Sequence, residues 1–262
     1  FHLIVQVSDR GKLVVAAQKQ TGAKVDMATA VAVVFGSTGA VGKALVEDLL
    51  LAEKWSTVRM VARRQVDPNT YFPAPVAAAA SSKLSQHIVD FENLEKSRDV
   101  FEGANTVFWA LGTTKKTAGS LEAQRHIDCD YTLSAANIIK ELKISQFQVV
   151  SSAGASAQSS TAYLHMKGEM EEKIRELGLE RVEIMRPSFL LTNEPRPEGR
   201  FWEGVATAVF KPLSWVLPES IKAIKVTTVA KAMRLIAEGT KDPNTSFRIH
   251  ENAELLKLGK QD

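Results

Sequence analysis

The sequence predicts an α/β protein with a doubly wound parallel sheet, and three observations support this prediction. A continuous apolar run at residues 30–35 has the length of a strand that is buried on both faces. Helical spacing of apolar residues follows from Ala40 to Leu51, and strand and helix patterns then alternate to about Arg186. Such alternation is typical of parallel strands joined by crossover helices. A chain of 262 residues with 45% hydrophobic content can bury the core of one such domain.

The remaining elements follow in order along the chain. Further strands are expected at residues 57–62, 86–89, 105–110, 147–151 and 182–185, with helices between them. The stretch 68–82 is rich in turn residues, so we interpret it as a surface insertion. After Pro187 the alternation fades, and residues 201–216 are aromatic and apolar. We therefore expect an N-terminal extension (1–29), the sheet domain (30–186), and a small C-terminal substrate or partner region packed on the same domain (187–262).

Composition excludes several classes of protein. The net charge is +3, with basic and acidic residues spread along the chain, so no affinity for nucleic acids follows. No apolar run approaches the ~20 residues of a membrane-spanning helix. Cys129 is the single cysteine, so an internal disulfide is impossible and secretion is not expected. These features predict a cytoplasmic or mitochondrial protein without a transmembrane segment, although residues 1–26 match a transit peptide poorly.

The segment Gly36-Ser37-Thr38-Gly39-Ala40-Val41-Gly42 lies between the first strand and the first helix. Glycines here let a phosphate approach the backbone, and the N-terminus of a helix favours anions. The alternative is a tight strand-to-helix turn without a ligand. The position after the first buried strand favours nucleotide binding and hence a Rossmann fold.

Arg63 and Arg64 follow the second strand, where an NAD-specific protein would place an acidic residue on the ribose. Two guanidinium groups suit a 2'-phosphate, so NADP(H) is the predicted cofactor, with a solvated basic strand end as the alternative. Asp90, after the third strand, could hold the adenine or merely cap a helix. Leu111 and Gly112 end the fourth strand, where Gly112 would admit the cofactor or form only a turn.

The predicted catalytic residues are Ser152, Tyr163 and Lys167. Tyr163 and Lys167 are four residues apart on an expected helix, so their side chains share a face. An ammonium beside the phenol favours tyrosinate. It therefore lowers the pKa of the phenol towards the range in which a tyrosine can act as a general acid or base. Ser152, at the end of the fifth strand, could donate to a substrate carbonyl, and we prefer it to Ser151 because it lies nearer the open end of the strand.

No metal site is predicted. The residues His126, Asp128, Cys129 and Asp130 crowd one helix without a second cluster of ligands elsewhere.

With these motifs in place, the chain resembles the Tat-interacting oxidoreductase-like group of atypical short-chain dehydrogenases, from about Val33 to Gly259. The G-x-x-G-x-x-G spacing is the form seen in extended and atypical members of that superfamily. The resemblance implies an NADPH-binding Rossmann protein with Tyr163 and Lys167 as the catalytic pair. Asp128 stands where many short-chain dehydrogenases have an asparagine in a proton relay. The residues implied to contact the cofactor are Thr38, Val41, Arg63, Arg64, Leu111, Gly112, Leu190 and Arg196.

The sequence therefore predicts an NADPH-dependent oxidoreductase that acts on a carbonyl or hydroxyl substrate. The alternative is a non-catalytic, NADPH-binding regulatory or structural subunit of a larger, for example mitochondrial, assembly. The retained catalytic residues favour the enzyme. The C-terminal aromatic residues suit a protein partner, a pocket or a packed core equally: Phe201, Trp202, Phe210 and Trp215.

Overall fold

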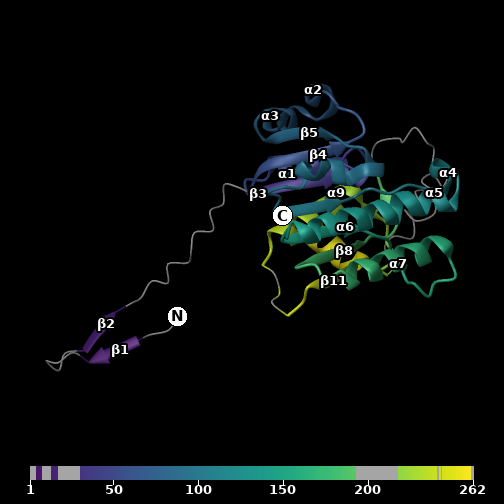
Figure 1. The fold of residues 1–262 in the computed structure, drawn as a ribbon. Coiled ribbons are helices and arrows are strands. Elements are labelled where there is room, and N and C mark those ends of the chain that lie inside the picture. Colours follow the sequence, from purple (N-terminus) through teal and green to yellow (C-terminus); the bar gives the residue numbers. More distant parts are fainter. Residues whose placement is uncertain are drawn as a thin grey trace.

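The computed structural model describes residues 4–7, 13–16, 30–192, 218–240, 242 and 244–260. Within these ranges, seven parallel strands form one sheet in the order β11-β8-β7-β6-β3-β4-β5 (Figure 1). The chain runs outward from β3 to β5, crosses back to β6, and continues outward to β11. This order confirms the predicted doubly wound Rossmann sheet. The strands are β3 (Ala30–Phe35), β4 (Trp55–Ala62), β5 (Leu84–Ile88), β6 (Thr106–Trp109), β7 (Gln146–Val150), β8 (Val182–Arg186) and β11 (Phe247–Glu251).

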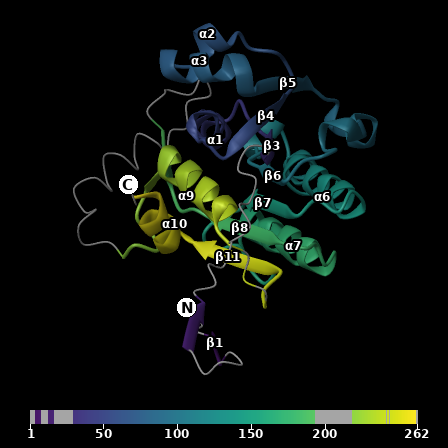
Figure 2. The ribbon, with the colours of Figure 1, turned by 90° about the vertical axis from the view of Figure 1, so that its left-hand side faces the viewer.

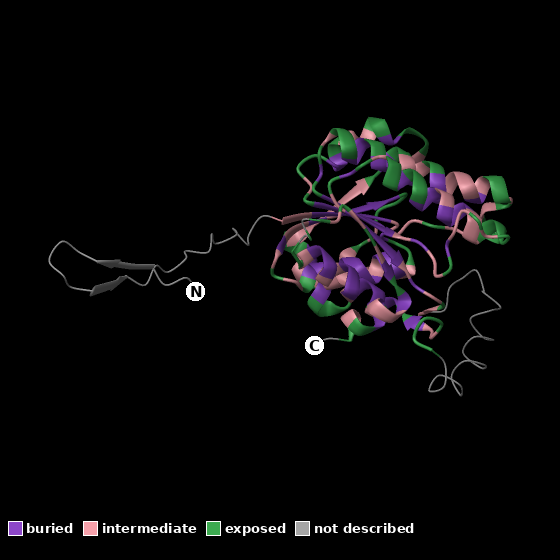
Figure 3. Ribbon diagram, turned by 90° about the horizontal axis from the view of Figure 1, so that it is seen from below, coloured by how far each residue is buried: buried purple, intermediate pink, exposed green. Residues whose placement is uncertain are grey.

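Both faces of the sheet are buried, which explains the continuous apolar run in β3. Ala32 and Val34 pack into one core, and Val33 and Phe35 pack into the other. Successive side chains on a strand point to opposite faces, so a strand covered on both sides needs apolar residues at every position. Figure 3 shows the buried strands between two outer layers of helices.

Helices α1 (Ala40–Leu51), α3 (Ala74–Lys83), α9 (Val226–Glu238) and α10 (Asn252–Gly259) cover one face. Figure 2 shows α9 between α1 and α10. An ion pair joins α9 to α1, with Arg234 Nε 2.6 Å from Asp48 Oδ2. The other face is covered by the 3-10 segment η1 (Phe91–Val100), α6 (Tyr131–Glu141) and α7 (Ala162–Glu176). Among the described residues, no helix is both long and apolar enough to cross a bilayer.

The prediction that residues 68–82 form a surface insertion is wrong. They form α2 (Pro68–Tyr71) and most of α3, and α3 packs against α1 through Val76 and Ala80. Pro73 directly precedes α3, and Pro75 lies in its first turn, where proline is tolerated because that N-H needs no helical partner. This segment is the crossover between β4 and β5.

The sheet continues beyond the predicted boundary at residue 186, because β11 pairs with β8 and α9 covers the sheet. β11 is an edge strand with the sequence Phe-Arg-Ile-His-Glu, so polar residues interrupt it and it lacks the continuous apolar run of the inner strands. The short strands β9 (Leu190–Leu191) and β10 (Ile224–Lys225) also pair in parallel. In the N-terminal extension, β1 (Ile4–Val7) and β2 (Leu13–Ala16) pair antiparallel. Arg196 and the aromatic residues Phe201, Trp202, Phe210 and Trp215 lie outside the described residues.

Candidate nucleotide and catalytic site

A cavity of about 800 Å³ opens at the carboxyl ends of the strands, where the strand order reverses between β3 and β6. Ligands of open α/β sheets bind at such switch points. The predicted residues that line it are Gly36, Thr38, Gly39, Arg63, Asp90, Leu111 and Gly112. The fold therefore brings together motifs that are up to 76 residues apart in the chain.

The three loop glycines have different reasons for being glycine. Gly36 has a φ of 70°, and a Cβ there would lie 2.5 Å from the Ala110 backbone. A Cβ on Gly42 would lie 2.1 Å from the carbonyl oxygen of Gly36. A Cβ on Gly39 would meet that oxygen at 3.1 Å, a much milder contact. Gly36 and Gly42 are therefore required by packing, whereas Gly39 leaves space at the N-terminus of α1, which has no side-chain cap.

Two other predicted residues of this loop are buried. The Ser37 hydroxyl donates to the Val61 carbonyl at 2.6 Å, which joins the loop to β4. The Val41 side chain lies in the core. Any contact of these two residues with a ligand must therefore come from their backbone.

The two arginines after β4 do not occupy equivalent positions. Arg63 lines the cavity, whereas Arg64 is exposed and is not among the lining residues. Lys43 and Tyr71 line the same part of the cavity, with Lys43 Nζ 4.8 Å from the centre of the Tyr71 ring. Neither residue belongs to a recognisable motif, so neither could be predicted from the sequence.

Both interpretations of Asp90 are consistent with its position. It caps η1 by accepting from the Glu92 N-H at 3.0 Å, and it accepts from Asn93 Nδ2 at 2.8 Å. The bonds from Asn93 and Glu92 lower the pKa of Asp90, so it is an acceptor at neutral pH. Phe91 and Tyr131 lie beside it in the cavity wall, with ring centroids 5.7 Å apart. This wall could accommodate a planar base.

The far end of the cavity is joined to the predicted catalytic helix through Asp128. Leu111, Gly112 and Thr113 line the cavity, and the Thr113 N-H donates to Asp128 Oδ1 at 2.7 Å. Asp128 Oδ2 lies 3.2 Å from Lys167 Nζ. One carboxylate therefore connects the cavity wall to α7. Of the later predicted contacts, Leu190 is half-buried in β9 and is not among the lining residues.

Tyr163 and Lys167 lie one turn apart on α7, as predicted, but in different environments. Tyr163 is 36% exposed, whereas Lys167 is 3% exposed. Burial alone would lower the pKa of Lys167, but the charges of Asp128 and Tyr163 outweigh it and raise this pKa above the usual lysine value. The amine of Lys167 is therefore an ammonium at neutral pH.

Ser151 and Ser152 have different partners. Ser151 is buried, and its hydroxyl donates to Glu171 Oε1 at 2.5 Å. Ser152 is half-buried, and its hydroxyl lies 3.4 Å from the Ala153 carbonyl. Because Ser151 is held in an internal network, this geometry favours Ser152 as the serine that could meet a substrate.

Two residues that position α7 were missed as site residues. Glu171 binds Arg186 through Nε at 3.1 Å and Nη2 at 2.5 Å, which ties α7 to β8. A Cβ on Gly168 would lie 2.1 Å from the Ser156 carbonyl carbon, so glycine lets α7 contact the segment after β7. A glycine inside an otherwise helical pattern was the available signal.

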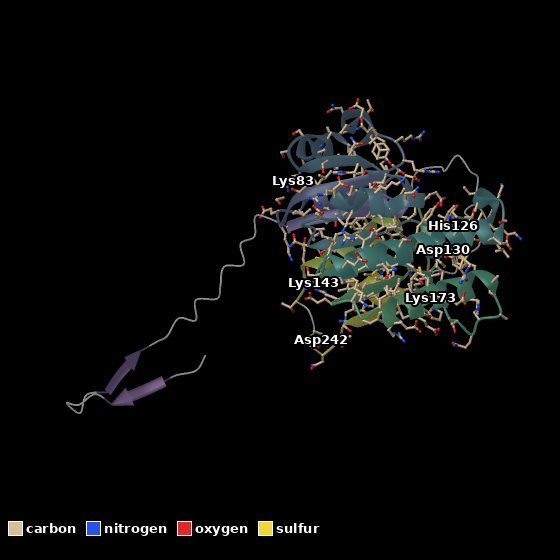
Figure 4. The ribbon with its side chains drawn as sticks, viewed as in Figure 1. Lys83, His126, Asp130, Lys143, Lys173 and Asp242 are labelled. Carbon is tan, nitrogen blue, oxygen red and sulfur yellow. The ribbon has the colours of Figure 1, made fainter. Side chains whose placement is uncertain are left out.

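The segment His126–Asp130 forms a π-helical turn, η2, between α5 (Leu121–Arg125) and α6, and α4 (Lys115–Ala118) precedes α5. His126 Nδ1 lies 3.0 Å from Asp130 Oδ2, and both residues lie near the surface (Figure 4). Cys129 is buried, and burial raises its pKa to about 11. Throughout the part of the chain that the structure describes, no cluster of three or more His, Cys, Asp or Glu residues could hold a metal ion.

Comparison with known proteins identifies relatives over most of the chain. The sequence profile of a family described as NAD(P)H-binding matches residues 36–209. Protein HTATIP2 of Rattus norvegicus is 33% identical over 231 residues, covering 87% of this chain and 88% of that protein. "Protein FMP52, mitochondrial" of Coccidioides immitis is 30% identical over 240 residues, covering 87% and 96%.

Solved structures share the fold at low sequence identity. MoeE5 in complex with UDP-glucuronic acid and NAD matches with a TM-score of 0.63 at 16% identity, over 86% of this chain and 76% of that one. UDP-glucose 4-epimerase of Thermotoga maritima, solved with UDP-glucose, matches with a TM-score of 0.59 at 16% identity, over 88% and 82%. At this identity, the likeness supports the Rossmann fold alone.

Proposed function

The chain belongs to the NAD(P)H-binding family of atypical short-chain dehydrogenases, as its motifs predicted, and we propose that it is an NADPH-dependent reductase of carbonyl compounds. One observation carries the proposal. Arg63 and Thr113 line one cavity, the Thr113 N-H donates to Asp128, and Asp128 pairs with Lys167, which lies one turn from Tyr163 on α7. Ser152, Tyr163 and Lys167 are not themselves among the residues that line the cavity. NADP(H) needs a cation at its 2'-phosphate, and carbonyl reduction needs proton-transfer groups near its nicotinamide.

The residues present fit a dinucleotide. Gly39 keeps the N-terminus of α1 open, and this helix start lacks a side-chain cap, so backbone N-H groups remain for a pyrophosphate. Arg63 would bind the 2'-phosphate as a charge-assisted donor. Asp90, Phe91 and Tyr131 would form the adenine end of the site. When bound, the nicotinamide supplies the hydride that adds to the carbonyl carbon.

The protein's own residues transfer a proton to the substrate and hold the substrate in position. The Tyr163 hydroxyl donates its proton to the carbonyl oxygen as the hydride arrives, and the resulting tyrosinate takes a proton back from solvent. The Lys167 ammonium favours that tyrosinate and offers a donor to the nicotinamide ribose. The Ser152 hydroxyl donates to the substrate oxygen and fixes its orientation. The products are an alcohol and the oxidised cofactor.

The experiment that tests this function has two stages. Mass spectrometry of the nucleotide that co-purifies with the protein should identify NADP(H). NADPH oxidation is then measured with a panel of aldehydes and ketones, with Tyr163→Phe as the control. Turnover by the wild type that the variant lacks supports a reductase. NADPH binding without turnover of any carbonyl would support the alternative, a nucleotide-binding structural or regulatory subunit.

The name of the FMP52 relative supports a mitochondrial location. We propose this location for the present protein as well. Fractionation of cells that express the full-length protein tests it.

A further inference from the structure

The buried pair of Asp128 and Lys167 carries an inference beyond the reaction itself. Asp128 is 1% exposed and Lys167 is 3% exposed, and their charged atoms lie 3.2 Å apart. An ammonium in such a dry environment loses its proton unless a charged partner compensates for the lost hydration. Without Asp128, Lys167 would therefore lose its proton at a lower pH than it does beside this carboxylate.

The contacts of Asp128 suit a carboxylate. Oδ1 accepts the Thr113 N-H at 2.7 Å, and Oδ2 faces the Lys167 ammonium. Both carboxyl oxygens of Asp128 therefore have a donor within hydrogen-bond distance. Thr132 Oγ1 also donates to the Asp128 backbone carbonyl at 2.9 Å, which fixes the turn that carries it.

The π-helical turn η2 places Asp128 inside the protein. His126 and Asp130 stay near the surface and pair with each other, while Asp128 and Cys129 are buried. A π-helical turn inserts one residue into a helix and redirects its side chains, and such turns are frequent at functional sites. Two carboxylates only two residues apart thus have different roles.

We propose that Asp128 is a positioning residue that keeps Lys167 protonated beside Tyr163, so that the ammonium serves the active site at every working pH. The inference rests on the proposed function insofar as Lys167 serves that reaction. The charged and titratable groups around Lys167 agree with this role. Asp128 and Cys129 face it from η2, and Tyr163 faces it from its own helix. Burial raises the pKa of Cys129, so its thiol carries no charge at neutral pH, and Asp128 supplies the negative charge.

The test measures the proton on Lys167 directly, in the cofactor-free protein. Lysine labelled with ¹³C reports the charge of each amine through its Cε chemical shift. The Lys167 signal is identified as the one missing from an Asp128→Asn/Lys167→Gln variant, which contains no unpaired buried charge. In the wild type, the signal should remain that of an ammonium to about pH 10 or above. In Asp128→Asn, its midpoint should fall by about two pH units or more.

Asp130→Asn is the matched control, because Asp130 lies on the same turn but pairs with His126. In this variant the Lys167 midpoint should move by less than about half a pH unit. Circular dichroism establishes that each variant is folded. If Asp128→Asn does not fold, the wild-type spectrum still decides, because a Lys167 signal that becomes neutral below about pH 8.5 would overturn the proposal.

A second readout connects the pair to catalysis. The basic limb of the pH profile for turnover should move to lower pH in Asp128→Asn, together with the Lys167 midpoint. An unchanged Lys167 midpoint in a folded Asp128→Asn protein refutes the inference and leaves the proposed reductase standing. Wild-type turnover by Tyr163→Phe refutes the reductase mechanism and leaves the Lys167 titration unaffected.

Discussion

Replacing Arg63 by alanine should remove most of the preference for NADPH over NADH, whereas replacing Arg64 should not. Arg63 lines the cavity and Arg64 does not, although both are exposed arginines at the end of the same strand. Arg64→Ala is therefore a control with the same loss of charge. NADH lacks the 2'-phosphate, so its affinity should be nearly unchanged in both variants.

The size of the effect follows from the exposure of Arg63. A hydrogen bond to a charged group contributes about 1.5–3 kcal/mol, and a solvent-exposed guanidinium belongs at the lower end. Since ~1.4 kcal/mol is a factor of ten, Arg63→Ala should weaken NADPH binding about tenfold. Screening should reduce this factor as salt is added.

Fluorescence titration of NADPH and NADH at low and high salt measures both affinities. A wild-type ratio of the two affinities in Arg63→Ala would rule out Arg63 as the ligand of the 2'-phosphate. An equal loss of that ratio in Arg64→Ala would show that the two arginines are equivalent, against their different positions.

Two further predictions concern the loop and the core. Gly39→Val should abolish nucleotide binding with little loss of stability, whereas Gly42→Ala should unfold or strongly destabilise the protein, because its Cβ would lie 2.1 Å from a backbone oxygen. Calorimetry and thermal melts separate the two effects, and equal melting temperatures for both variants would contradict the packing argument. Glu183 accepts from His250 Nε2 at 2.7 Å and from Arg181 Nε at 2.6 Å. Burial alone would raise the pKa of Glu183, but these bonds outweigh burial and lower it. Glu183→Gln should therefore cost about 1–3 kcal/mol of unfolding free energy at pH 7. A carboxylate with a lowered pKa stabilises above its unfolded pKa, so this difference should shrink below about pH 4.5. A loss that is independent of pH in urea unfolding would show that the carboxylate charge is not involved.

The inner strands could be predicted from the sequence because burial on both faces demands continuous apolar runs. The prediction failed where that demand is absent. Polar residues interrupt the edge strand β11, and Pro73 and Pro75 resemble turn signals although one directly precedes α3 and the other lies in its first turn. These elements depend on their position in the sheet, which local patterns do not encode.

The candidate site shows the same division. The glycine loop and the pair of Tyr163 and Lys167 have fixed spacings, so both could be found in the sequence. The different positions of Arg63 and Arg64 could not, because they depend on how the chain turns after β4. The pairing of Asp128 with Lys167 joins residues 39 positions apart and depends on a π-helical turn, for which the sequence carries no spacing signal.

If Tyr163 is the proton donor of an NADPH-dependent reductase, replacing it by phenylalanine should stop the reaction and leave cofactor binding intact. This substitution removes one hydroxyl from a side chain that is 36% exposed, so fold and NADPH affinity should be retained. Lys167→Ala should weaken both binding and turnover, because its ammonium serves the ribose as well. For a carbonyl that the wild type accepts, Tyr163→Phe should lower kcat by about 10²-fold or more while the Kd for NADPH is unchanged. Turnover of that substrate by Tyr163→Phe at the wild-type rate would contradict it.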